Sequence, residues 1–252
     1  MPDNSSEPSG RSSLGRADAI LSSFDEQHPT MSLTGIMDHT GLPKTTVYRA
    51  IEKMLELGWL EHDGDRYSIG SRLFEMASLT RLRMNLRESA LPHLEHLYEA
   101  THETVHLAVL DGHQVLYVEK ISGHSPATEV SRVGGRLPAH CTGVGKVLLA
   151  FQPPELTAEV IEAGLVARTP ATITSPARLC DELDRVRADG VAFDREECDP
   201  GVACVAAPVI GPGDVCISAV SITGPADRLR LERLTSAVRT TALAIAHTLR
   251  SA

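Results

Sequence analysis

The chain is 252 residues long and 42% apolar, enough for one large domain or two domains of ordinary size with buried cores. No apolar run approaches the ~20 residues that a membrane helix requires, and we see no charged-then-apolar leader, so we expect a cytoplasmic protein without a membrane partner. Five cysteines without C-x-x-C spacing argue against a disulfide framework, and the net charge of -9 argues against a generally basic surface for nucleic acid.

The first 70 residues contain a tail and three expected helices. Residues 1–13 are rich in Ser, Pro, Asp and Gly without an apolar period, which predicts a disordered tail. Apolar residues from Leu14 to Phe24 fall at helical spacing and predict a first helix. A short second helix ends at Gly41, and a third begins at Pro43 and ends at Gly58.

A hairpin is expected directly after the third helix. The pair Asp63-Gly64 is a strong signal for a two-residue turn. If the turn centres on that pair, Glu61 lies opposite Arg66 and Leu60 lies opposite Tyr67. Helix, turn, helix and hairpin over residues 14–70 form the layout of a winged helix-turn-helix, a module that places one helix in the major groove of DNA.

The positive charge of this segment is local. Residues 1–70 have more acidic than basic residues, so the expectation of DNA binding depends on position within the motif. Arg49 suits a guanine edge, and Arg66 on the hairpin suits a minor groove or a phosphate. The simpler alternative is a solvated surface helix. The expected DNA-binding residues are Lys44, Thr45, Thr46, Tyr48, Arg49, Lys53 and Arg66.

The remaining residues predict a linker and a second, mixed domain. Ser71 can cap a linker helix over 71–85, which either joins two copies or packs on its own chain, and a helix follows over 86–101. Alternating strands flank Asp111-Gly112, and helical patterns recur at 144–151, 153–163 and 176–189. Strands at 202–210 and 215–223 precede a final helix at 226–250. Strands grouped with helices at both ends indicate an α+β domain with an antiparallel sheet over 86–252.

The segment 134–149 carries the densest motif. Small and polar residues lead into an apolar helix, whose free N–H groups can receive a carboxylate. The segment is not a nucleotide-binding P-loop, because His140 and Val147 occupy positions where that motif needs Gly and Ser or Thr.

The last hairpin predicts a pocket. A turn centred on Pro212 and Gly213 places Cys204 opposite Ser221 and Val202 opposite Thr223, and opposed residues share a face. Asp194 ends a neighbouring apolar segment and can join them. Small polar groups in an apolar domain describe a small-molecule site. The alternative is that Cys204 is a buried small hydrophobe and the hydroxyls satisfy backbone groups.

Three stretches together resemble the IclR family of bacterial transcription regulators: Gly41-Leu42-Pro43-Lys44-Thr45-Thr46-Val47-Tyr48-Arg49, Leu137-Pro138-Ala139-His140 running into Gly143-Val144-Gly145-Lys146, and Cys204-Val205-Ala206-Ala207-Pro208-Val209 followed by Ser221-Ile222-Thr223-Gly224-Pro225. The resemblance covers about residues 14–250. It implies a winged helix, a linker helix and a C-terminal GAF-like effector domain. It also implies homodimers that pair into dimers of dimers, and effectors that are small organic or aromatic acids.

The resemblance also implies a set of effector-binding residues, with Thr223 standing where a serine is frequent. They are Cys141, Thr142, Gly143, Val144, Asp194, Cys204, Ser221 and Thr223. The resulting prediction is a ligand-responsive, DNA-binding repressor of a catabolic operon, with no cofactor, no metal ion and no enzymatic activity.

Two other functions use the cysteines. A redox- or metal-sensing regulator would use Cys141, Cys198 or Cys204 with His140 or His106, although the spacings match no zinc pattern. An enzyme would need Cys141 activated by His140, but adjacent residues seldom orient as nucleophile and base.

Overall fold

The computed structural model describes residues 12–25, 27–79, 81–124 and 131–251. The chain divides into two compact units, one ending at Arg81 and the other beginning at Leu82. Residues 1–11 of the tail expected over residues 1–13 lie outside the described residues. Its expected end is wrong, because Ser12 accepts a hydrogen bond from the Gly15 N–H as N-cap and Ser13 already belongs to the first helix.

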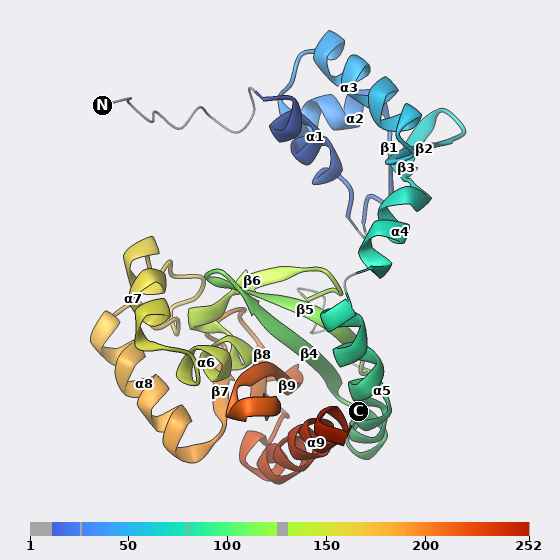
Figure 1. Cartoon of the computed structure of the whole chain (residues 1–252). Coiled ribbons are helices and arrows are strands. Elements are labelled where there is room, and N and C mark those ends of the chain that lie inside the picture. The colour runs from blue at the N-terminus through green and yellow to red at the C-terminus, as the bar shows by residue number, and fades with distance from the viewer. Residues whose placement is uncertain (1–11, 26, 80, 125–130, 252) are drawn as a thin grey trace. The chain divides into compact units, whose positions relative to one another are not determined.

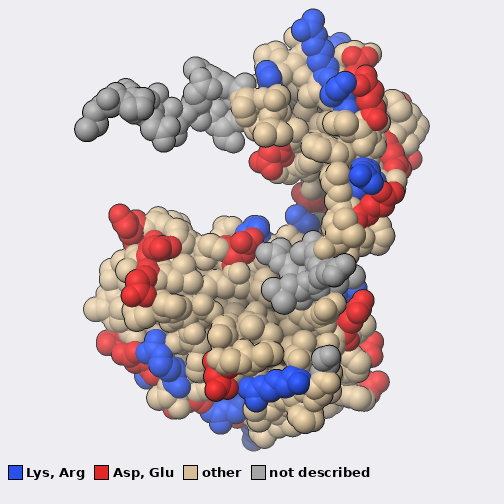
Figure 2. All heavy atoms as spheres, in the orientation of Figure 1, with Lys and Arg blue, Asp and Glu red and all other residues tan. Residues whose placement is uncertain are grey.

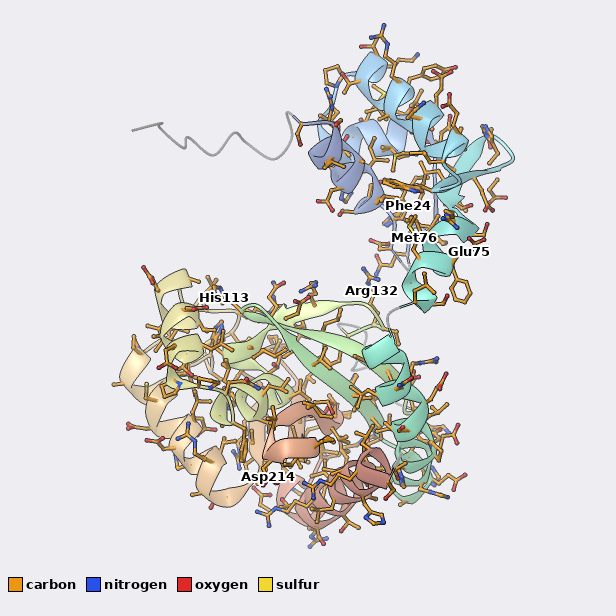
Figure 3. The ribbon with its side chains drawn as sticks, in the orientation of Figure 1. Phe24, Glu75, Met76, His113, Arg132 and Asp214 are labelled. Carbon is orange, nitrogen blue, oxygen red and sulfur yellow. The ribbon has the colours of Figure 1, made fainter. Side chains whose placement is uncertain are left out.

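The first unit is a helical bundle with a small sheet (Figure 1). Its core is formed by apolar side chains from all three of its first helices, and Phe24, just beyond the first helix, packs into it (Figure 3). The elements are α1 (Ser13–Leu21), β1 (Thr30–Met31), α2 (Leu33–Thr40), α3 (Lys44–Glu56), β2 (Leu60–Asp63), β3 (Arg66–Ile69) and α4 (Ser71–Ser78), with strand order β1-β3-β2.

The predicted register of the β2–β3 hairpin is wrong by two residues. Asp63, not Glu61, lies opposite Arg66, and Leu60 lies opposite Ile69. The turn is therefore Gly64-Asp65, with Gly64 at φ 64° in its first position. A left-handed first turn residue is where hairpins favour Gly, so the glycine of the Asp-Gly pair opens the turn.

The linker helix is shorter than expected. α4 ends at Ser78, and a separate helix, α5, begins at Arg81, so the predicted 71–85 helix is two elements. Ser71 is not the cap either: Gly70 holds that position, and Ser71 donates both its N–H and its hydroxyl to the Glu61 carboxylate.

The second unit is an α+β domain around one antiparallel sheet, which confirms the predicted fold class. The six strands run in the order β6-β5-β4-β9-β8-β7. The elements are α5 (Arg81–Thr101), β4 (Thr104–Asp111), β5 (Gln114–Ile121), β6 (Arg136–Pro138), the 3₁₀ turn η3 (Ala139–Cys141), α6 (Gly143–Ala150), α7 (Pro154–Ala163), α8 (Pro176–Asp189), β7 (Ala192–Arg195), β8 (Val202–Ile210), η4 (Pro212–Asp214), β9 (Cys216–Pro225) and α9 (Leu231–Ser251).

Each face of this sheet has its own helical layer (Figure 1). Val105, Val205 and Ile222 point toward α5 and α9, whereas their sequence neighbours point toward α6, α7 and α8. This follows from the two-residue period of a strand. Among the described residues, no helix is long and apolar enough to cross a membrane.

The predicted register of the β8–β9 hairpin is also wrong by two residues. Cys204 lies opposite Thr223, Ser221 lies opposite Ala206, and Val202 lies opposite Pro225. The connection contains the η4 turn and a register shift after Val209, so it is longer than the predicted two-residue turn. Because the error is an even number of residues, every side chain keeps its predicted face.

Candidate functional sites: a helix face and a buried pocket

The face of α3 opposite its buried stripe carries most of the predicted DNA contacts. Val47, Ile51 and Met54 are buried in the first unit, while Lys44 and Arg49 are exposed. Neither of these two cations has a recorded ion pair in the described part of the chain. Basic and acidic side chains lie side by side on this unit (Figure 2).

Other members of the predicted set already have partners within the unit. Lys53 pairs with Glu56 at 2.6 Å, and Arg66 donates to the Thr30 carbonyl at 2.6 Å. Tyr48 is hydrogen-bonded to Glu52, which raises the pKa of its phenol. These groups must exchange an internal contact for a DNA contact, whereas Lys44 and Arg49 need not.

A groove between α1 and α3 adds a cation that sequence reasoning did not select. Arg16 of α1 lines it together with Thr45, Thr46, Arg49 and Lys53 of α3. Arg16 is half-buried, one turn before the buried Ile20, and the packing of α1 on α3 brings it to the α3 groove.

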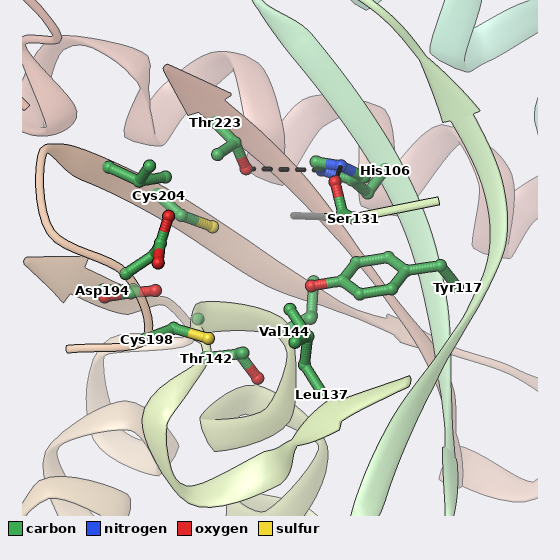
Figure 4. Close-up of a pocket in the computed structure, with 13 residues that line it drawn as sticks. His106, Tyr117, Ser131, Leu137, Thr142, Val144, Asp194, Cys198, Cys204 and Thr223 are labelled. Carbon is green, nitrogen blue, oxygen red and sulfur yellow. Dashed lines mark hydrogen bonds between the residues drawn. The ribbon is translucent and has the colours of Figure 1, made fainter. Parts of the chain in front are cut away.

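The second unit contains a pocket between the sheet and the start of α6 (Figure 4). Its lining residues surround about 430 Å³ of atom-free space, a volume that includes open solvent. Asp194, Cys198 and Cys204 lie on one side, and His106, Ser131 and Tyr117 lie on the other. The lining residues are His106, Tyr117, Ser131, Leu137, Thr142, Gly143, Val144, Asp194, Cys198, Asp199, Val202, Cys204 and Thr223.

Most of the predicted effector-binding residues line this pocket, and two do not. Thr142, Gly143, Val144, Asp194, Cys204 and Thr223 are at its wall. Cys141 is fully buried beneath it, with its thiol directed at the Pro138 carbonyl 3.7 Å away. The Ser221 hydroxyl lies behind the wall, 3.4 Å from Nδ1 of His106.

His106 organises the side of the pocket opposite Asp194. Its Nε2 is 2.7 Å from the Ser131 hydroxyl, and its Nδ1 is 3.3 Å from the Thr223 hydroxyl. Burial, with a smaller contribution from Lys120, lowers the pKa of His106 to about 3. The imidazole is therefore neutral and offers one donor and one acceptor to its surroundings.

Asp194 is the buried carboxyl of the pocket. It is 4% exposed and accepts the Glu197 N–H at 2.7 Å. Burial raises its pKa to about 7, against the lowering effect of that hydrogen bond. The carboxyl thus changes charge near neutral pH.

Two thiols at the pocket, those of Cys141 and Cys204, are held in their neutral form. Burial raises the pKa of Cys204 to about 12, and a hydrogen bond with Cys198 together with burial raises the pKa of Cys141 further. Neutral thiols are poor nucleophiles and poor metal ligands, which weakens the redox, metal and enzyme alternatives. No group of metal-binding residues occurs within the described residues.

Lys146 fastens the start of α6 to the turn after β7, and sequence reasoning missed this role. The side chain is fully buried, with its Nζ 2.5 Å from Glu197 and 3.2 Å from Glu182. The Glu197 N–H also donates a hydrogen bond to the Asp194 carboxyl. The Lys146–Glu197 ion pair therefore supports the wall of the pocket that carries Asp194. The sequence did hint at a buried ion pair here, because Lys146 is the one charged residue in an otherwise apolar helix.

Comparison with known proteins gives consistent matches over both units. A family model described as "IclR helix-turn-helix domain" matches residues 13–64, and one described as "Bacterial transcriptional regulator IclR C-terminal" matches residues 78–247. The HTH-type transcriptional regulator XynR of Escherichia coli is 35% identical over 214 residues, which are 84% of this chain and 85% of XynR. The acetate operon repressor of Salmonella typhimurium is 32% identical over 228 residues, 88% of this chain and 83% of that protein.

Solved structures extend the similarity to the fold. An IclR homolog from Microbacterium hydrocarbonoxydans, crystallised in complex with 4-hydroxybenzoate, has a TM-score of 0.87 and 30% sequence identity. The similarity covers 96% of this chain and 100% of that one.

Proposed function

Because this chain belongs to the IclR family of bacterial transcriptional regulators, we propose that it is a ligand-responsive repressor of a catabolic operon. In this proposal the first unit binds an operator in double-stranded DNA, and a small organic or aromatic acid binds the pocket of the second unit. A ligand that prefers one state of the protein shifts the DNA affinity by its difference in affinity for the two states.

The pocket is the observation that carries the proposal. It is mostly apolar and is lined by a few polar groups: three hydroxyl side chains, a phenol, a neutral imidazole and two carboxyls. Such a lining suits a small ring or chain with polar ends. The complex of a similar regulator with 4-hydroxybenzoate supports an aromatic acid as the first candidate.

Exposed apolar side chains on α4 support association of two copies. Phe74 is 76% exposed, Leu79, the C-cap of α4, is 77% exposed, and Met76 on the same helix is 43% exposed. Figure 3 labels Met76 on this helix. Large apolar groups gathered on one short helix mark an interaction surface. We infer a homodimer through α4, and a dimer of dimers is the extension that the family resemblance implies.

The test is a gel shift on the DNA upstream of the protein's own gene. The acid panel contains 4-hydroxybenzoate, benzoate, pyruvate and glyoxylate. We expect a sequence-specific shift that one class of acid weakens or strengthens. A shift that no acid alters contradicts the acid-responsive part, and no specific shift under any condition contradicts the regulator itself.

A further inference from the structure

Two unpaired donors lie at the start of α6. Thr142 caps this helix: its hydroxyl accepts the Gly145 N–H at 3.2 Å and its carbonyl accepts the Lys146 N–H at 2.9 Å. The N–H groups of Gly143 and Val144 have no recorded acceptor within the described residues, and both residues line the pocket. A helix start with free N–H groups favours an anion.

The buried carboxyl shares this corner of the pocket. A Cβ placed on Gly143 would lie 2.9 Å from the sulfur of Cys204, and Cys204 is the cross-strand neighbour of Asp194. The start of α6, which carries these donors, and the Asp194 carboxyl therefore both border the pocket. No Lys or Arg is among the described lining residues, so no cation in the wall separates the two charges.

The charges around Asp194 do not neutralise it. Lys146 is the cation that acts on it, but its Nζ is already bound to Glu197 and Glu182. The other titratable groups that act on Asp194 or line the pocket are the neutral His106 and a set of acids, thiols and a phenol: Glu197, Asp199, Cys141, Cys198, Cys204 and Tyr117. Arg168 and Lys120 also lie near the pocket, but their side chains are bound to the backbone carbonyls of Cys198 and Ser131. An ionised effector would thus meet acids and no lining cation unless a proton accompanies it.

We propose that a carboxylate effector binds this pocket together with one proton, which resides on Asp194 and is donated as an O–H···O⁻ hydrogen bond to the effector. The proton comes from solvent, the effector stays ionised, and no covalent bond changes. The inference rests on the proposed function, because it requires an acid as the ligand.

The state of the empty pocket supports this coupling. Burial already raises the pKa of Asp194 to about 7, so the carboxyl is partly protonated at neutral pH. A second negative charge within hydrogen-bond distance raises the pKa of the pair's shared proton further. Two close carboxyl groups that hold one proton between them are an established arrangement in proteins.

The consequence is a specific pH dependence. Below about pH 6 Asp194 is already protonated, so affinity for an acid does not vary with pH. Above about pH 7 each binding event takes up a proton, so affinity falls about tenfold per pH unit. A neutral ligand of the same shape, such as 4-hydroxybenzyl alcohol, shows neither effect.

Isothermal titration calorimetry of the full-length protein measures this directly. Each acid of the panel is titrated at about pH 6 and about pH 8, in two buffers of different ionisation enthalpy, which gives the number of protons bound with the ligand. We expect about 0.9 proton at pH 8 and about 0.1 at pH 6. Asp194→Asn retains the acceptor for the Glu197 N–H, so it should bind the acid with no proton uptake and with a pH-independent affinity.

The matched control is Asp189→Asn, at an exposed aspartate at the end of α8, which should behave as the wild type. Acid binding with no proton uptake at pH 8 overturns this inference and leaves the proposed function intact. Uptake that persists in Asp194→Asn also overturns it, because the proton would then reside elsewhere. No binding of any acid at either pH overturns the acid-responsive function and the inference with it.

Discussion

At the scale of single residues, two glycines at the start of α6 have different tasks. A Cβ on Gly145 would lie 2.2 Å from the Ala139 carbonyl oxygen and 2.5 Å from the Ala139 Cα, both of which are backbone atoms. A Cβ on Gly143 would meet side chains only: the sulfur of Cys204 at 2.9 Å, then the Cβ atoms of Ala206 and Cys204 at 3.5 and 3.7 Å. Gly145 therefore permits the helix to pack on η3, while Gly143 leaves space in the pocket.

This difference predicts opposite phenotypes for two matched substitutions. Gly145→Ala should lower the free energy of unfolding by ~1–3 kcal/mol or more, because the backbone must shift. Gly143→Ala should cost little stability but weaken acid binding, since the new methyl group occupies the corner beside Cys204. Urea unfolding and calorimetry on both variants measure the two effects. Equal losses of stability would contradict the assignment.

Asp194 should make stability depend on pH. Its folded pKa of about 7 lies above the ordinary value of 3.8, so the protonated carboxyl stabilises the fold fully below about pH 4. This contribution, roughly 4 kcal/mol at its full extent, is lost as pH rises to about 7 and is constant above that. The free energy of unfolding of the wild type relative to Asp194→Asn should fall over this window. A difference that does not change with pH would contradict a raised pKa.

Individual site residues were predictable where a local pattern marks them. The hairpin over β8 and β9 led to Cys204 and Thr223, and the family resemblance added Gly143; all three line the pocket. His106 and Tyr117 line the opposite side of the pocket from β4 and β5, and only the strand order of the folded sheet brings them there (Figure 4). The partners of Lys146 lie 36 and 51 residues away, which no local pattern can indicate.

At the scale of elements, α3 presents cations of two kinds. Lys44 and Arg49 have no recorded ion-pair partner in the part of the chain that the structure describes, whereas Lys53 is bound to Glu56. A cation that must first break an ion pair within the protein gains less free energy from a contact with a DNA phosphate. The contribution of α3 to DNA binding should therefore be concentrated at its start and middle.

Alanine substitutions on α3 test this gradient. Arg49→Ala should cost ~1–3 kcal/mol of operator affinity and relax sequence preference, as expected for a base contact. Lys44→Ala should weaken binding to all DNA sequences. It should also lower the slope of log affinity against log salt concentration by about one. Lys53→Ala, on the same helix, serves as the control and should have a smaller effect. Fluorescence anisotropy at several salt concentrations gives these values, and an equal loss for all three variants would contradict the gradient.

Elements were easier to predict than their pairing. The helix at 176–189 and the strand at 202–210 have their predicted bounds, because Pro, Gly and apolar periods mark them clearly. Both hairpin registers that were predicted from a turn dipeptide were wrong by two residues. A turn signal locates a reversal of the chain, but the φ angle of Gly64 and the bulge after Val209 decide which residues face each other.

At the scale of the whole molecule, the chain combines a helix-turn-helix unit with an α+β unit that contains the pocket. The order of elements alone predicted this combination, since helices at both ends of a run of strands indicate an α+β domain. The coupling between the units that we propose has no counterpart in the order of elements. It requires that the acid bind two states of the protein with different affinity.

The most direct test of that coupling is the dissociation constant for upstream DNA, measured by anisotropy with and without a saturating acid. The wild type should show at least about a fivefold change, the lower end of typical coupling between two sites. Gly143→Ala should bind the DNA with the wild-type affinity in the absence of acid and show little response at the same acid concentration. A wild-type dissociation constant that stays the same at saturating acid would contradict the account.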